Sequence, residues 1–116
     1  MTVAAILFAI AALGGVVMAL MRLSGRDYPP MALAIVHGLF AAAGLVALIV
    51  ALVSAAIPTM AKIALILFLG AAIGGFVLFS YHLKKRALPI SYVIGHGIVA
   101  VIAFVILIAA IMSRGS

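Results

Sequence analysis

Long apolar runs separated by short polar breaks dominate this chain. The runs cover residues 2–21, 30–53, 58–83 and 89–112. A helix needs about 20 apolar residues to cross the roughly 30 Å of hydrocarbon in a bilayer. The pattern therefore predicts four membrane-spanning helices joined by three short connections.

Prolines and charged residues mark the ends of these predicted helices. Pro30, Pro58 and Pro89 stand where apolar runs begin, and proline is favoured at the first helical position. The stretch 54–59, SAAIPT, is expected to be a tight turn. The first and third runs end at charged residues: Arg22, Arg26 and Asp27 after the first, and Lys84, Lys85 and Arg86 after the third.

The two halves of the chain repeat each other. The segment ILFAIAALGG, ending at Gly15, matches ILFLGAAIGG, ending at Gly75. After the loop, the offset between the halves decreases by one residue. Pro30 then aligns with Pro89, and the His-Gly pair that starts at His37 aligns with the pair that starts at His96. These paired glycine, proline and histidine matches indicate an internal duplication.

The duplication defines the expected fold. Repeat 1 covers about 2–53 and repeat 2 about 59–112, and each is a helical hairpin with the same direction through the membrane. Such hairpins form a parallel repeat, related by an axis along the membrane normal. We therefore predict an all-α, integral membrane four-helix up-down bundle, with residues 1–116 forming a single transmembrane domain.

The composition restricts the function to the membrane and its two faces. Of the 116 residues, 71% are hydrophobic and only 7% are charged, whereas soluble domains carry about 25% charged residues. The absence of cysteine excludes disulfides, iron–sulfur clusters and thiolate sites. The seven basic residues form no stripe long enough to follow a nucleic-acid backbone. The expected partner is the membrane, with no nucleic acid.

The distribution of charge predicts the orientation. Five of the seven basic residues lie in the first and third connections, and cytoplasmic loops carry an excess of lysine and arginine. We expect a multi-pass protein of a bacterial-type inner (plasma) membrane. The basic loops would be cytoplasmic, and both termini would lie outside.

Two histidines inside apolar helices are the candidate site. In an up-down bundle the second and fourth helices lie on one diagonal. His37 and His96 each follow their helix-opening proline by seven residues, which places both about 10 Å from the helix ends. The repeat axis would then place the two rings opposite each other at equal depth. We predict that they are the axial ligands of one b-type haem, since two imidazoles alone make an incomplete zinc site.

Small, apolar and basic residues around the histidines fit this prediction. Two glycine pairs on the other diagonal are level with the histidines and would make room for the edges of the macrocycle. The expected haem contacts are Gly14, Gly15, Gly74, Gly75, Ala41 and Ala100. Gly44 and Ala103 are expected to widen the slot, and Phe40, Phe76, Phe79 and Phe104 to form an apolar shell. Arg22, Arg26, Lys85 and Arg86 are expected near the propionates.

The four-span layout and the histidine pair resemble the bis-histidine membrane cytochromes b, including the four-helix b561-like group. The resemblance implies haem b and a role as an electron carrier rather than as a catalyst. It covers the layout, His37, His96 and the nearby glycines. That group commonly carries two haems and more histidines, so its roles in quinone and superoxide chemistry are not transferred. Closed six-coordinate iron suits electron transfer. Partner subunits, quinone or self-association would complete such a carrier.

Two alternatives stay open. In the first, the chain is an accessory or scaffold subunit of a membrane complex, and its histidines are structural or bind a pigment. In the second, the chain is a small transporter. Four spans in this length resemble the small multidrug resistance exporters. Those proteins depend on a glutamate within the first span, whereas this chain has no glutamate and its sole acid, Asp27, lies in a loop.

Overall fold

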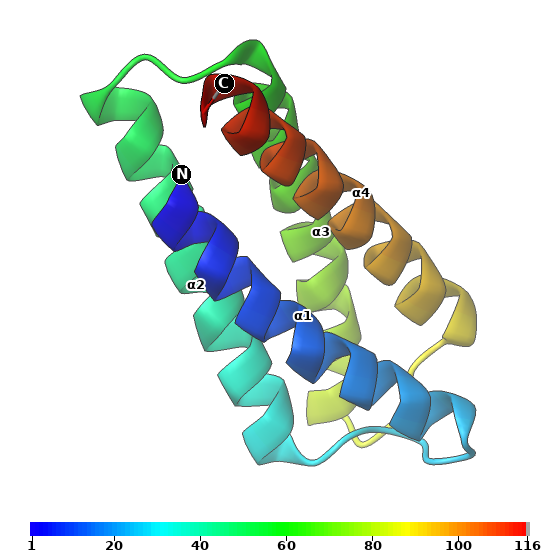
Figure 1. The fold of residues 1–116 in the computed structure, drawn as a ribbon. Helices are drawn as coiled ribbons and strands as arrows, with labels where there is room; N and C mark the ends of the chain where they lie inside the picture. Colours follow the sequence, from blue (N-terminus) through cyan, green and yellow to red (C-terminus); the bar gives the residue numbers. More distant parts are fainter. Residues whose placement is uncertain (116) are drawn as a thin grey trace.

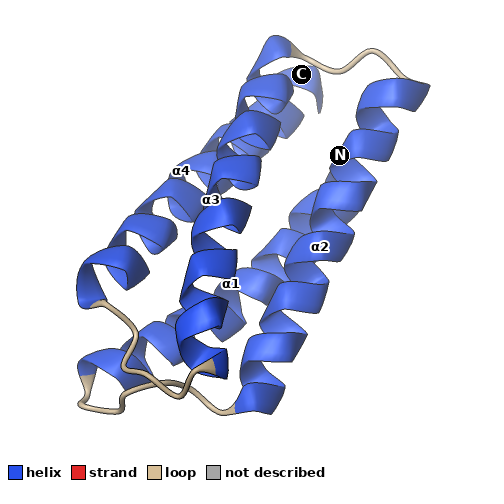
Figure 2. Cartoon of the chain, turned by 180° about the vertical axis from the view of Figure 1, so that it is seen from behind, coloured by secondary structure: helices blue, strands red, loops and turns tan. Residues whose placement is uncertain are grey.

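The computed structural model describes residues 1–115, all helical apart from the connections. The helices are α1 (Thr2–Leu23), α2 (Met31–Ser54), α3 (Thr59–Leu83) and α4 (Ile90–Gly115). They form the predicted all-α four-helix bundle (Figures 1 and 2), with extents of 44 × 19 × 19 Å. Each helix is long and apolar enough to cross a membrane, which indicates a multi-pass membrane protein.

The helices run up and down in a closed ring. Each packs against its neighbours in the chain, and α1 also packs against α4. Helices α1 and α3 therefore lie on one diagonal, and α2 and α4 on the other. The α1–α2 and α3–α4 connections lie at one end, called here the loop end. Both termini and the α2–α3 connection lie at the opposite end, called the termini end (Figure 1).

The helix bounds differ slightly from those predicted. Pro30 and Pro58 are the N-cap residues of α2 and α3, one position before the helix begins. Helix α4 continues to Gly115, beyond the predicted end at Met112. No glycine or proline interrupts the chain between 98 and 114, so nothing in that stretch breaks the helix.

The duplication is visible in how α1 and α3 end. The amide of Arg26 donates to the Met21 carbonyl, and the amide of Arg86 donates to the Tyr81 carbonyl. These bonds close the same C-terminal motif, in which the preceding residue has a left-handed backbone. In repeat 1 that residue is Gly25 (φ 108°), but in repeat 2 it is Lys85 (φ 53°).

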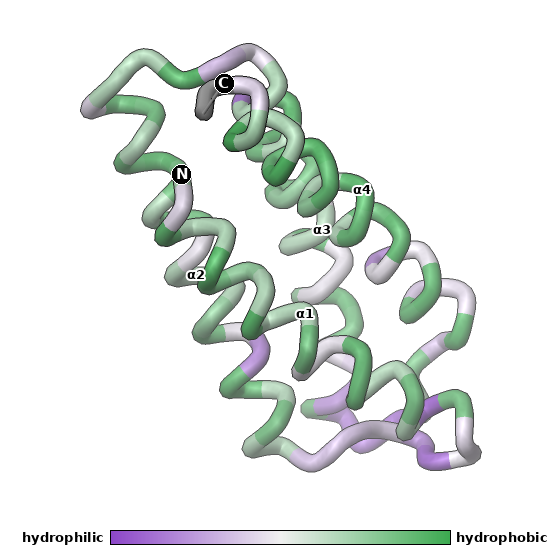
Figure 3. Tube along the Cα trace, in the orientation of Figure 1, coloured by the Kyte–Doolittle hydropathy of each residue, from purple (hydrophilic) through white to green (hydrophobic). Residues whose placement is uncertain are grey.

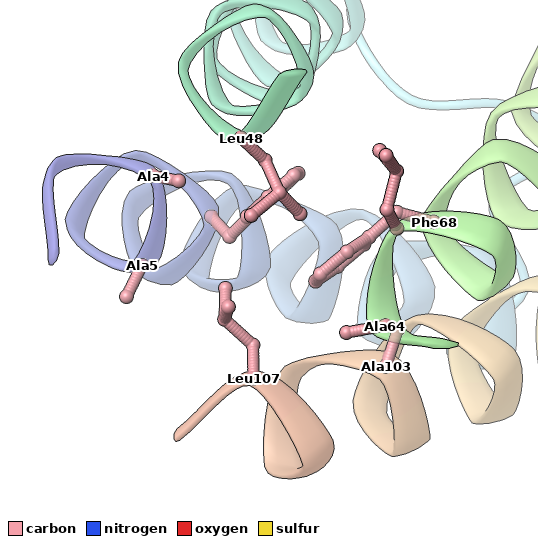
Figure 4. Packing of buried hydrophobic residues seen from close by; sticks show 9 residues of the cluster. Ala4, Ala5, Leu48, Ala64, Phe68, Ala103 and Leu107 are labelled. Atoms are coloured by element: carbon pink, nitrogen blue, oxygen red, sulfur yellow. The ribbon is translucent and has the colours of Figure 1, made fainter. Parts of the chain in front are cut away.

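A packed core fills the half of the bundle near the termini. The rings of Phe8 and Phe68 stack across the α1–α3 diagonal, 3.7 Å apart between centroids and 4° from parallel. On the other diagonal, Leu48 and Leu107 are fully buried and point toward the same centre (Figure 4). Both pairs are equivalent positions of the two repeats. Alanines and Leu65 complete this core, which holds the two hairpins together.

The half of the bundle near the loops has no comparable core. Within the helical segments 12–23, 31–43, 72–83 and 90–102, His82 is the one buried residue. The side chains that face the bundle interior there are only half-buried. Figure 3 shows apolar residues along all four helices and hydrophilic ones gathered at the loop end. The hairpins are therefore joined tightly at the termini end and loosely around the level of the two helix-borne histidines.

Candidate functional site

His37 and His96 face each other across the α2–α4 diagonal. Their ring centroids are 6.2 Å apart, and the ring planes are nearly perpendicular, at 81°. Both side chains are half-buried. The two rings come from equivalent positions of the repeats, and the structure brings them together as the duplication predicts.

Each histidine is oriented by a hydrogen bond within its own hairpin. The Nδ1 atom of His37 lies 2.7 Å from the carbonyl oxygen of Ala11, and that of His96 lies 2.7 Å from the carbonyl oxygen of Ala71. A carbonyl oxygen only accepts, so Nδ1 carries the proton in both rings. In the neutral form the Nε2 atom of each ring therefore keeps a free lone pair.

The glycine pairs let the imidazoles reach these carbonyls. A Cβ at Gly15 would lie 3.0 Å from Cε1 of His37, and a Cβ at Gly75 would lie 3.3 Å from Cε1 of His96. Both glycines follow the accepting alanine by four residues, on the same helix face. The glycines thus contact the histidine rings themselves, a role that the sequence analysis did not assign to them.

Gly14 and Gly74 make looser contacts with the same rings. A Cβ at Gly14 would lie 3.6 Å from Cβ of His37, and one at Gly74 would lie 3.6 Å from Nδ1 of His96. These are ordinary van der Waals distances. The second glycine of each pair is therefore the one with the tighter steric requirement.

The separation of the rings decides what could lie between them. Two imidazoles that share a direct N–H···N hydrogen bond have centroids about 5 Å apart. Two imidazoles bound to one metal ion through bonds of about 2 Å have centroids about 6 Å apart. The observed 6.2 Å at 81° is longer than the first distance, and it fits both the second case and a direct edge-to-face contact between the rings, for which centroids lie about 4.5–7 Å apart. No group of three or more His, Asp or Glu side chains that could hold a metal occurs among the described residues, so His37 and His96 would be the only ligands from the protein.

The residues predicted to widen the slot separate into two groups. Ala41 and Ala100 are half-buried on the histidine-bearing helices. Gly44 and Ala103 instead belong to the packed half: Gly44 lies against the ring of Phe8, where a Cβ would be 2.9 Å from Cε1, and Ala103 is fully buried in the core. The prediction of a slot at Gly44 and Ala103 is therefore wrong, because side chains of the core fill that space.

The predicted aromatic shell is only partly present. Phe40 is half-buried, and Phe104 packs on the core of the termini end. Phe79 stacks on His82, with centroids 5.9 Å apart. Phe76 is 75% exposed, so its assignment to the shell is wrong: it lies on the outward face of α3.

The predicted propionate-binding cations all lie at the loop end. Arg26, Lys85 and Arg86 are exposed. Arg22 is half-buried and donates from Nε to the carbonyl oxygen of Leu88, at 2.8 Å. Of the four, Arg22 is therefore the one held closest to the bundle interior.

His82 forms a contact that the sequence analysis missed. Its Nε2 atom lies 2.6 Å from the carbonyl oxygen of Pro29, and the ring packs edge-to-face against Tyr28. Its side chain is 94% buried. It is the repeat equivalent of Arg22, and the two side chains make equivalent bonds to opposite hairpins.

The sequence spacing indicates the two carbonyls that accept hydrogen bonds from His37 and His96, although they were not predicted. Ala11 and Ala71 are equivalent residues that each precede a repeated glycine by one helical turn, and a glycine at that position uncovers the carbonyl. No comparable signal indicated the contact between His82 and Pro29, because it depends on how the two loops lie across each other.

Comparison of the chain with protein-family models, with curated proteins and with solved structures finds no match.

Proposed function

We propose that this protein is a small membrane cytochrome that holds one haem b between His37 and His96 and carries electrons. The observation that carries the proposal is the pair of equivalent imidazoles with centroids 6.2 Å apart, set in the half of the bundle that lacks a core. A bound haem would supply one-electron redox chemistry, and ligation on both faces disfavours oxygen binding.

The orientation of the imidazoles supports this role. A histidine that binds a metal usually donates its other ring N–H to a carbonyl or carboxylate, which fixes the tautomer and raises the basicity of the ligand. His37 and His96 both make such a bond, to Ala11 and Ala71. In each neutral ring Nε2 is then the nitrogen left to ligate a metal.

The loosely packed surroundings support it as well. A macrocycle needs space between the helices at the level of its ligands, and interiors of folded proteins are normally close-packed. Here the histidine-bearing half leaves its inward-facing side chains only half-buried. Ala41 and Ala100 would line the group, while Gly14, Gly15, Gly74 and Gly75 hold the rings of its two ligands. Arg22 is the cation best placed for a propionate.

Absorption spectroscopy tests the proposal directly. The protein would be purified in mild detergent from a host with ample haem, and reduced-minus-oxidised spectra recorded. We expect a low-spin haem b signal in the wild type and none in His37→Gln or His96→Gln. Glutamine keeps a side-chain N–H for the alanine carbonyl but does not ligate iron, so these variants separate ligation from structural hydrogen bonding. Ile98→Ala, an exposed position at similar depth on α4, is the matched control.

The second candidate is an accessory subunit of a larger membrane complex. It is favoured by the hydrogen bonds of His37 and His96 to their own hairpins, which stabilise the fold without any cofactor. A colourless protein that remains folded in the wild type would support this candidate and contradict the haem site. A bound pigment would support it too.

We also propose that the loop end is cytoplasmic, in a bacterial-type inner membrane, with both termini outside. The excess of basic residues at the loop end supports this orientation. The chain contains no cysteine, so Ala87→Cys and Ala55→Cys each introduce a unique thiol at opposite ends. In intact cells a membrane-impermeant maleimide should label Ala55→Cys and not Ala87→Cys.

A further inference from the structure

Four exposed cations form a surface at the loop end of the bundle: Arg26, Lys84, Lys85 and Arg86, called here the loop-end cationic surface. We propose that it is the docking face for an acidic, water-soluble electron-transfer protein. This inference rests on the proposed function, since it names the partner with which such a cytochrome would exchange electrons.

The surface has a strong and uncompensated charge. Asp27, the only acid in the chain, lies beside it in the α1–α2 connection. Among the described residues these groups form no ion pair with one another. The net charge of this end is therefore positive, and complementary charge would steer an acidic partner toward it.

The two loops that carry the surface are joined into one platform. The amide of Leu88 donates to the Asp27 carbonyl at 2.9 Å. Arg22 and His82 add one bond each across the hairpins. These three links hold the two loops that carry the cations against each other, so cations from distant parts of the sequence share one face, which favours recognition by an acidic protein surface.

The surface also lies at the end nearer the candidate haem site. His37 is six residues from the start of α2 at Met31 and seventeen from its end at Ser54. At 1.5 Å per residue these are about 9 Å and 25 Å. The connections at the loop end are short, so a soluble partner would reach the site over the shorter path from that end.

Binding of an acidic probe tests the surface independently of haem. The protein would be placed in nanodiscs of neutral phosphatidylcholine and titrated with fluorescein-labelled poly-L-glutamate. We expect binding that weakens with salt, and a loss of about tenfold in affinity for the triple variant Lys84→Gln, Lys85→Gln, Arg86→Gln. Lys62→Gln, which removes an exposed cation at the termini end, should bind like the wild type. Equal binding by the triple variant would overturn the proposal.

Electron transfer from the reduced protein provides the second readout. Ferricyanide accepts one electron from each reduced haem and becomes ferrocyanide, and hexaammineruthenium(III) accepts one electron as a cation. The triple variant should react about tenfold more slowly with ferricyanide and no more slowly with hexaammineruthenium(III). Unchanged ferricyanide rates would overturn the docking face. Absence of any haem signal would overturn the proposed function. It would also overturn the assignment of the partner as an electron-transfer protein, even if the surface binds poly-L-glutamate.

Anionic lipid headgroups are the competing occupant of the loop-end cationic surface. If they occupy it, nanodiscs that contain phosphatidylglycerol would abolish poly-L-glutamate binding. Native mass spectrometry would also show phosphatidylglycerol retained by the wild type and lost from the triple variant. That combination would contradict the proposal and assign the cations to anionic headgroups.

Discussion

Arg22 and His82 occupy equivalent positions in the two repeats, and each donates a hydrogen bond to the residue before the proline that directly precedes the second helix of the other hairpin. Arg22 reaches the carbonyl of Leu88, and His82 reaches that of Pro29. The side chains differ, but the bonds follow the same pseudo-twofold axis. They fasten the starts of α2 and α4, which carry the candidate ligands.

Removal of the His82 donor is predicted to destabilise the fold. His82→Leu leaves the Pro29 carbonyl without its partner, and the loss should be about 1–3 kcal/mol in the free energy of unfolding. His82→Gln retains a side-chain N–H and should recover part of this loss. Thermal unfolding in detergent would measure both variants, and a leucine variant as stable as the wild type would show that the bond contributes nothing.

The two glycines of each pair are predicted to respond differently to a methyl group. Gly15→Ala places a Cβ 3.0 Å from the His37 ring, whereas Gly14→Ala places one at 3.6 Å. The first variant should displace the imidazole from Ala11 and, for the proposed haem site, reduce haem retention about tenfold or more, while the second retains most of it. The haem-to-protein ratio after purification gives the comparison. Equal retention by both variants would contradict the steric argument.

Gly44 is predicted to be intolerant of alanine for a reason unrelated to the histidines. Its Cβ would lie 2.9 Å from the ring of Phe8, which is stacked on Phe68. Overpacking of a core costs about 1–3 kcal/mol. Gly38→Ala on the same helix, where nothing lies within 4 Å, should be neutral or slightly stabilising. A denaturant titration of the two variants would test the difference, and similar midpoints would argue against the close contact.

Lys85→Gly is predicted to stabilise the protein. Lys85 has a φ of 53°, and the left-handed region costs a residue with a Cβ about 1 kcal/mol. Its repeat equivalent, Gly25, already avoids this cost. Lys84→Gly serves as the control, since Lys84 has φ −83° and gains no relief. An increase in the unfolding midpoint for the Lys85 variant alone is the expected result.

The fold was predictable because the membrane constrains the sequence so strongly. Four apolar runs and three prolines located the helices to within a few residues. The duplication then supplied the arrangement that brings His37 and His96 together, a contact between residues far apart in the chain. Local pattern alone would not have placed them on one diagonal.

The details of the site were less predictable, because they depend on which neighbour fills each space. A small residue on the histidine-bearing face can open a slot or admit a neighbouring ring, and Gly44 does the second by accepting Phe8. Phe76 sits next to Gly75 in the sequence, but the helical rotation turns it outward. The contact of His82 with Pro29 arises from loop geometry, which apolar periodicity does not encode.

The uneven packing of the bundle has a consequence for assembly. Phe8, Phe68, Leu48 and Leu107 join the hairpins at one end without help from any ligand. For the proposed cytochrome, the polypeptide would therefore insert and fold before it acquires a haem, since the bonds at the loop end also join the hairpins without a ligand. Maturation then becomes a separate, later event, governed by delivery of the group to an already assembled apoprotein.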